Sequence, residues 1–492
     1  MKQHLWKAIA ALVALLLLAA CSNSGTNTES TMETNAAPSP ASTEKASAET
    51  EEMTEFAASI PEGTDYDGYE FDILVYDETN AVWYDVDFTA EELTGDVLND
   101  AVFQRKIKVE DALNIKIVTH PEEAYCYTPM YNSVQSGDGA YDCGMIGLQD
   151  NFTLAEKKLL YDLNTIENFE INAPWWDQNC VRELSIAHRN YQLTGDISIL
   201  YRKSIRVLYY NKSLAANYNL ANPYDMVDNM TWTVDALTSL CSNVSADLDG
   251  NGIRDENDRY GLLYSSGTAA IVFVASDVNY ATKDENDLPV PSFYCEKAIN
   301  VWDRYTKLLF DEEMAADCSA KSWDYSGMFV ADQGLFCCME LHHVEELREM
   351  DNDFGILPMP LYDESQEDYL VMVNVGPAAA CCIPVTNLEL ERTAYILDSL
   401  GAEGKNILTP AYYESYLRGK TTRDEESRHS LEIIFNSVRY DIGACCDWAK
   451  IGSLPSNLLS DVSTDFVSGY KKIEKGINKA WERTIKGFQD EG

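Results

Sequence analysis

A regular pattern of apolar and polar positions begins after a long polar stretch. Apolar residues alternate with other side chains over 71–75, which predicts a strand, and recur at helical spacing over 98–113, which predicts a helix. The same criteria predict a strand over 115–118, a short helix over 130–135 and a third strand over 141–146. Strands and helices that alternate in this order imply an α/β fold with a parallel sheet and right-handed crossovers.

The carboxyl ends of these strands are the expected binding edge of the sheet, because ligands of open α/β sheets bind beyond them. The first strand leads into a loop with Trp83 and Tyr84, and the third leads into a turn with Gln149 and Asp150. We therefore expect these four side chains at a binding site. Far along the chain, the apolar spacing over 470–485 predicts an amphipathic helix that packs on the folded body.

The N-terminal segment has the pattern of a secretion signal. Lys2 and Lys7 precede an unbroken apolar run over 8–20, whose small final residues lead to Cys21. This run is shorter than the roughly 20 residues that a membrane-spanning helix needs. The sequence Leu-Ala-Ala-Cys ending at Cys21 resembles a bacterial lipobox, which implies cleavage after residues 1–20 and a lipid such as palmitate on Cys21. The alternative is an ordinary signal peptide with a chance cysteine.

Composition and size predict how the rest of the chain is organised. Residues 21–66 are mostly Ser, Thr, Asn, Ala, Pro and Glu and cannot bury enough apolar surface to fold, so we expect a disordered lipoprotein tether. The remainder of the 492-residue chain exceeds the roughly 250–300 residues that one hydrophobic core supports, so we expect two lobes. A formal net charge of -44 disfavours nucleic acid and anionic membrane surfaces as partners.

The 13 cysteines are predicted to be mostly free and buried. Apart from Cys21 their number is even, which in an exported chain would favour disulfides. However, the adjacent pairs at 337–338 and 381–382 lie inside apolar runs, where cysteine behaves as a small hydrophobic residue. Neighbouring residues on a strand also point to opposite faces and do not readily bridge each other.

The segment over 247–258 has the spacing of a calcium-binding loop, with oxygen side chains at positions 1, 3, 5, 9 and 12 and a glycine at position 6. It departs from that pattern at Asp258, where glutamate is usual, and at Arg254, where an apolar residue is usual. The alternative is a surface turn stabilised by its own Asp and Asn side chains. The predicted ligands of a structural Ca²⁺ are Asp247, Asp249, Asn251, Ile253, Asp255 and Asp258.

Several short segments, in this order, carry a family resemblance. They are Tyr141-Asp142, the run over 207–212, Thr231-Trp232-Thr233, the run over 354–358 and Ile383-Pro384. From about Tyr69 to Trp481 the chain resembles the extracellular solute-binding proteins of ABC importers, of the maltose-binding type. The resemblance implies a two-lobed, hinged, type 2 periplasmic-binding-protein-like fold with the ligand between the lobes. By analogy, residues 67–198 with 341–383 form lobe 1, and residues 199–340 with 384–492 form lobe 2.

Aromatic residues favour a carbohydrate ligand for such a fold, because the flat C–H faces of sugars pack on aromatic rings. The chain has 9 Trp and 29 Tyr, although any single Trp is more often a core residue. The resemblance places these candidate ligand-binding residues at the cleft: Trp83, Tyr84, Gln149, Asp150, Trp175, Trp176, Ser265, Ser266, Glu340, Asn374, Tyr412 and Trp448.

The sequence favours a binding protein over an enzyme, since it has no serine-hydrolase, zinc-protease or phosphate-loop motif. His342 and His343 are adjacent, so we do not expect them on one face of a helix or strand, and we interpret them as structural. The resemblance implies a monomer, lipid-anchored on the extracytoplasmic face of the cell membrane, that delivers an oligosaccharide to an ABC permease. The alternatives are a surface glycan-degrading enzyme and a ligand receptor for a sensor kinase.

Overall fold

The computed structural model describes residues 55–77, 79, 83, 86–122, 126–413 and 425–489. The predicted signal peptide, Cys21, the first part of the tether and Tyr84 lie outside these residues. Among the helices of the described part, none combines the length and the apolar character needed to cross a membrane.

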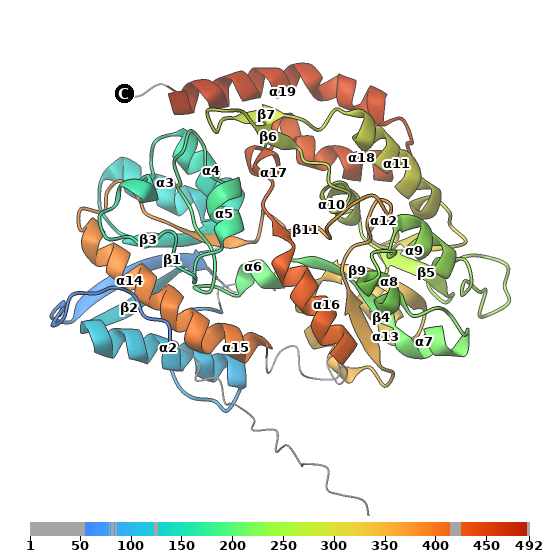
Figure 1. Cartoon of the computed structure of the whole chain (residues 1–492), viewed down its shortest axis with the longest axis horizontal. Coiled ribbons are helices and arrows are strands. Elements are labelled where there is room, and N and C mark those ends of the chain that lie inside the picture. The colour runs from blue at the N-terminus through green and yellow to red at the C-terminus, as the bar shows by residue number, and fades with distance from the viewer. Residues whose placement is uncertain are drawn as a thin grey trace, which may run out of the picture. The chain divides into compact units, whose positions relative to one another are not determined.

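The first sheet confirms the predicted order of strand, helix, strand, helix and strand. It has four strands in the order β12-β3-β1-β2, with β1 parallel to both β2 and β3 and with β12 antiparallel to β3. Figure 1 shows this sheet with α2 and α14 beside it. The strands are β1 (Tyr69–Tyr76), β2 (Ile115–Glu122), β3 (Cys143–Gly147) and β12 (Ala379–Cys382), and the helices are α2 (Val97–Leu113), α3 (Tyr127–Ser136), α4 (Leu148–Glu156), α5 (Gln178–Glu183) and α14 (Leu390–Glu403).

Local capping explains where the helices of the first sheet begin and end. The Asp96 carboxylate accepts hydrogen bonds from the first backbone N–H groups of α2, and Asn114 ends that helix in the left-handed conformation. Gly137 ends α3 in the same way, with a φ of 68°. The predicted ends at 113 and 135 are therefore close to the observed ones, whereas α3, which has no side-chain cap, begins three residues earlier than predicted.

The second sheet has five strands in the order β10-β4-β9-β5-β8. Strand β5 is parallel to β8 and β9, whereas β4 runs antiparallel to β9 and β10. The strands are β4 (Arg206–Asn211), β5 (Tyr260–Tyr264), β8 (Ala315–Asp317), β9 (Gly334–Glu340) and β10 (Phe354–Leu357). The helices around it are α7 (Lys212–Asn217), α8 (Pro223–Asp228), α9 (Val234–Cys241), α10 (Thr268–Ala275), α11 (Glu296–Leu309), α12 (Cys318–Lys321), α13 (Tyr325–Val330) and α16 (Glu425–Asn436).

The two sheets define two lobes, but the predicted lobe boundaries need correction. Residues 341–383 were assigned to lobe 1, yet β10 pairs with β4 in the second sheet. Residues 384–492 were assigned to lobe 2, yet α14 packs against α2 beside the first sheet. The order of similar segments gave no information on these pairings, because each joins residues far apart in the sequence. The chain returns to the first lobe only between β11 (Val371–Met372) and β12.

Several shorter elements connect the lobes. Strand β11 pairs in parallel with β13 (Val438–Arg439), and α17 (Ile442–Cys446) contacts both α4 and β6. The predicted C-terminal amphipathic helix is confirmed as α19 (Phe466–Gln489), which contacts α4, α11 and β7 (Figure 1).

The other elements are α6 (Leu200–Lys203), β6 (Ala281–Lys283), β7 (Pro289–Pro291), α15 (Thr409–Ala411), α18 (Leu454–Ser460), the 3-10 helices η2 (Leu163–Thr165), η3 (Leu341–Glu349) and η6 (Trp448–Ser453), and the π-helical turn η4 (Gly404–Leu408).

The last part of the predicted tether lies against the first lobe. The backbone of Phe56 exchanges two hydrogen bonds with the side-chain amide of Asn406, at 2.9 and 2.7 Å. Ser59 donates from its backbone N–H and its hydroxyl to Glu170. The prediction of disorder up to residue 66 is therefore wrong for residues 55–66, because side chains far away in the sequence bind this polar segment.

The prediction for the cysteines is confirmed for the described residues. All twelve cysteines there are free, and ten of them are buried. The pair Cys337-Cys338 lies within β9 and the pair Cys381-Cys382 within β12, so neighbouring thiols face opposite sides of a sheet.

Candidate functional site

A cavity of about 300 Å³ lies where the segments after β3 and β5 meet, and we call it the inter-lobe cavity. Gln149 follows β3 by two residues, and Gly267 follows β5 by three, so both lie beyond the carboxyl ends of their strands. The connection between β11 and β12 closes the cavity. Its lining residues are Gln149, Arg206, Gly267, Ala270, Ile271, Tyr280, Met372, Asn374, Val375, Gly376, Ala444, Asp447, Gly452 and Ser453.

Gln149 and Asn374, both predicted from the sequence, are brought together in this cavity. The Gln149 side chain donates to the Ala444 carbonyl at 2.9 Å, which joins α4 to α17. Gly147 and Gly376 approach closely, since a Cβ atom on Gly147 would lie 2.4 Å from the Gly376 carbonyl oxygen. The absence of a side chain at Gly147 therefore lets the β11–β12 connection lie over the end of β3.

Arg206 is the cationic residue of the cavity, and sequence reasoning missed it. It stands opposite Glu340 in the pairing of β4 with β9, and its guanidinium donates to the Glu340 carboxylate and to the Ser265 hydroxyl. Burial acts to raise the pKa of Glu340, but the attraction of Arg206 and the hydrogen bonds to the carboxylate together outweigh it, so this pKa is lowered. A basic residue that opens an apolar strand was the signal in the sequence.

The predicted residues Ser265 and Glu340 are thus connected to the cavity through Arg206. Ser266 lies next to them, with its backbone N–H donating to Ser319 at 2.8 Å. Trp83, from the loop after β1, packs edge-on against His342 of η3, with ring centroids 4.8 Å apart.

Four predicted aromatic residues are core residues, and none has its ring at the inter-lobe cavity. The indoles of Trp175 and Trp176 both donate to one Asp398 carboxylate oxygen, at 3.0 and 2.8 Å. Trp448 donates to Thr484 of α19 at 3.1 Å, and Tyr412 is fully buried. Buried hydrogen-bond partners far along the chain orient the three indoles away from the inter-lobe cavity, but Trp175 and Trp176 line a second cavity, so their contact with a ligand stays a prediction.

Asp150 is a further predicted residue that does not line the cavity. Burial raises the pKa of Asp150 to about 6, although one backbone hydrogen bond from Tyr127 acts in the opposite direction. The carboxyl therefore belongs to the packing between α3 and α4.

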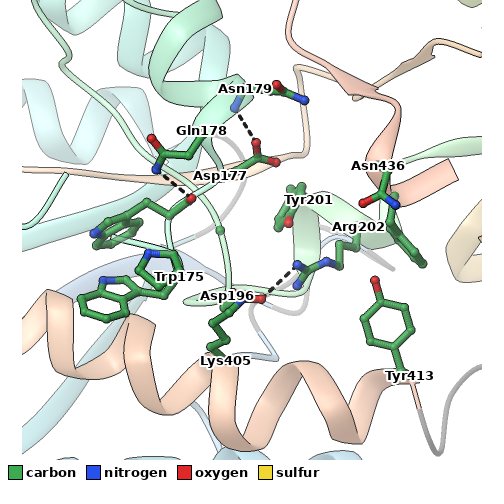
Figure 2. A pocket seen from close by; sticks show the side chains of 14 residues that line it. Trp175, Asp177, Gln178, Asn179, Asp196, Tyr201, Arg202, Lys405, Tyr413 and Asn436 are labelled. Atoms are coloured by element: carbon green, nitrogen blue, oxygen red, sulfur yellow. Dashed lines mark hydrogen bonds and ion pairs between the residues drawn. The ribbon is translucent and has the colours of Figure 1, made fainter. Parts of the chain in front are cut away.

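A second cavity, of about 290 Å³, lies beside α6 (Figure 2). Asp196 accepts from Arg202 at 3.0 Å and from Lys405 at 3.2 Å, so one carboxylate neutralises part of the charge of two cations. Figure 2 shows Trp175 on one side of this cavity and Tyr413 on the other. Its two cations are engaged with Asp196, and the Asp177 carboxylate accepts from Asn179, Cys180 and Tyr440. The inter-lobe cavity remains the better candidate because it joins the carboxyl ends of strands from both sheets.

The structure resembles solved solute-binding proteins, whereas no protein-family model and no curated protein matches the sequence. A sugar transporter from Rhizobium etli in an open conformation is 13% identical, with a TM-score of 0.58 over 85% of this chain and 99% of that chain. A cyclo/maltodextrin-binding protein complexed with maltotetraose is 13% identical, with a TM-score of 0.55 over 85% and 97%. A Mycobacterium tuberculosis protein in complex with glycerophosphocholine is 15% identical, with a TM-score of 0.52 over 78% and 96%.

These similarities confirm the predicted fold. The chain has the α/β, two-lobed fold of maltose-binding-like periplasmic binding proteins. At such low identity the ligand of this chain has to be argued from its own cavity.

Proposed function

We propose that this chain is the solute-binding component of an ABC importer and that it captures a neutral oligosaccharide in the inter-lobe cavity. One observation carries the proposal: polar side chains from both lobes line a cavity beyond the carboxyl ends of β3 and β5. Ligands of α/β sheets bind at this position. Delivery to a membrane permease is part of the proposal and is supported by the fold of the sugar-binding neighbours.

The cavity suits a ligand with many hydroxyl groups. Gln149 and Asn374 offer amide donors and acceptors, while Ile271, Met372 and Val375 offer apolar contacts for C–H faces. The charge of Arg206 is offset by Glu340, so the cavity presents no excess positive charge to an anion. A neutral ligand also approaches a chain of net charge -44 without repulsion.

A thermal-shift screen tests this proposal. A sugar at about 100 times its Kd should stabilise the chain by roughly 2.7 kcal/mol if the unfolded chain does not bind it. Gln149→Ala should weaken binding of that sugar about tenfold or more, whereas Gln178→Ala, in the second cavity, should leave it unchanged. If the two variants change the affinity for the sugar equally, the sugar does not bind in the inter-lobe cavity.

Lipid anchoring is a second part of the proposed function, and it rests on the Leu-Ala-Ala-Cys sequence alone. Cys21→Ala should abolish labelling of the protein by a radioactive or clickable fatty acid and leave the protein either soluble or unprocessed. Cys295→Ala, at the exposed cysteine of the described residues, is the matched control and should keep both the labelling and the membrane retention. Full labelling of the Cys21→Ala variant would contradict a lipid on Cys21.

We also propose a structural Ca²⁺ in the loop over 247–258. Carboxylate oxygens of Asp247, Asp249 and Asp258 lie within 4.8 Å of one another, as the ligands of one ion require. In the structure Asp258 is fully buried and accepts backbone hydrogen bonds from Leu248 and Asp255, at 2.9 and 3.0 Å. These bonds orient the carboxylate at position 12, and they also support the alternative of a self-stabilised turn.

Removal of calcium distinguishes the two interpretations of this loop, a Ca²⁺ site and a self-stabilised turn. Chelation should lower the melting temperature, with an affinity of about 10⁻⁴ to 10⁻³ M as in other extracellular calcium modules. Asp249→Ala should abolish this sensitivity, and the exposed Asp461→Ala, outside the loop, should retain it. Superimposable melting curves with Ca²⁺ and with chelator would favour the self-stabilised turn.

A further inference from the structure

The junction between β9 and η3 gathers two histidines and a carboxylate, contrary to the expectation that adjacent histidines diverge. Side chains three residues apart eclipse in a 3-10 helix, so His343 and Glu346 lie along one edge of η3, and Glu340 at the end of β9 faces His343 at 3.8 Å. The His342 ring tilts against the His343 ring, with centroids 4.0 Å apart. Sequence reasoning failed here because it considered only regular helices and strands.

We propose that Glu340, His342 and His343 form a binding site for a divalent transition metal, with Zn²⁺ the ion that fits best. Ligand atoms of the three residues lie within 4.8 Å of one another. Two imidazole nitrogens and one carboxylate oxygen are a typical donor set for zinc with a fourth position open to water or substrate. The site is separate from the proposed Ca²⁺ loop, which offers only oxygen ligands.

The two oxygens of the Glu340 carboxylate face different partners, so Arg206 does not block the side that faces the histidines. Arg206 contacts one carboxylate oxygen, Oε1, and the other, Oε2, faces His343 at 3.8 Å.

Glu346 supplies the orienting contact that metal-binding histidines usually have. Its Oε2 lies 3.1 Å from Nδ1 of His343, and a carboxylate at this distance favours the tautomer with the proton on Nδ1. The lone pair is then on Nε2, the nitrogen left for a metal as in carboxylate–histidine–metal arrangements, and Nε2 lies 3.8 Å from Glu340 Oε2. The Tyr325 hydroxyl lies 3.1 Å from the same Nε2 and competes for this lone pair.

Titration of the metal-free chain tests the site without any sugar, so its failure would leave the proposed sugar binding untouched. The titration is done with excess Ca²⁺, which fills sites made only of carboxylates. Calorimetry should then show Zn²⁺ binding. Bound Co²⁺ should give visible absorption bands, and added Zn²⁺ should displace the Co²⁺ and remove these bands. His342→Ala and His343→Ala should each weaken Zn²⁺ binding at least 100-fold. His429→Ala, an exposed histidine on α16, should leave binding unchanged.

Two milder variants keep the test decisive if a histidine variant fails to fold. Glu346→Gln should weaken Zn²⁺ binding about 10–100-fold through loss of the orienting contact, whereas the adjacent Glu345→Gln should not. Tyr325→Phe should bind Zn²⁺ as tightly as the wild type or more tightly, since it removes the competing hydroxyl. Absence of Zn²⁺ binding, or equal binding by the Glu346 and Glu345 variants, would overturn the proposal.

Discussion

Replacing Asp398 by alanine is expected to lower the free energy of unfolding by about 3 kcal/mol, because two buried indole N–H groups lose their acceptor. The Asp398 carboxylate accepts from Trp175, Trp176 and the Glu170 backbone, and burial raises its pKa to about 6 while these donors oppose the rise. Denaturant unfolding measures the change.

Asparagine at position 398 is the matched control. It retains one acceptor oxygen for the indoles, so Asp398→Asn should cost less than half as much as Asp398→Ala. If the two variants unfold at the same denaturant concentration as the wild type, the carboxylate does not organise this part of the first lobe.

Arg206→Met should also lower the free energy of unfolding strongly, because it leaves the Glu340 carboxylate buried without its cation. Loss of one partner of a buried ion pair typically costs about 3–5 kcal/mol. Both side chains are less than a tenth exposed, so solvent cannot replace the lost contact. The pKa of Glu340 should then rise, and the variant should become relatively more stable as the pH falls through that new value. Unfolding at several pH values measures both effects.

The double variant Arg206→Met with Glu340→Met is the control for this pair. Removal of both charges avoids the unpaired carboxylate, so the double variant should recover most of the lost stability. If the double variant is as unstable as Arg206→Met, the loss comes from the packing of the guanidinium instead of from the ion pair.

The sequence was informative wherever structure depends on near neighbours. Asp96 and Gly137 mark helix ends through contacts within a few residues, and those bounds were predicted closely. The lobe boundaries were wrong because β10 finds its partner strand β4 through pairing across more than 140 residues, as in Phe354 with Asn211. No local pattern encodes such a pairing.

The candidate site also contains some residues that local sequence patterns could predict and others that depend on contacts far along the chain. Gln149 was found because it follows a predicted strand at the expected edge of the sheet, and Asn374 was found through the family resemblance. Trp175 and Trp176 do not line the inter-lobe cavity, and a tryptophan that stacks on a ligand and one that donates to a buried carboxylate look alike in sequence. Their acceptor, Asp398, lies more than 200 residues away.

Small-angle X-ray scattering of the lipid-free chain, with and without the sugar that stabilises it most, tests the central claim most directly. A ligand held between two hinged lobes must bind the closed form better than the open form. We therefore predict a smaller radius of gyration at saturating sugar, and a Gln149→Ala variant that compacts only at higher sugar concentration. Stabilisation by amino acids, peptides or glycerophosphodiesters but by no sugar, or an unchanged scattering curve with every stabilising sugar, would contradict the account.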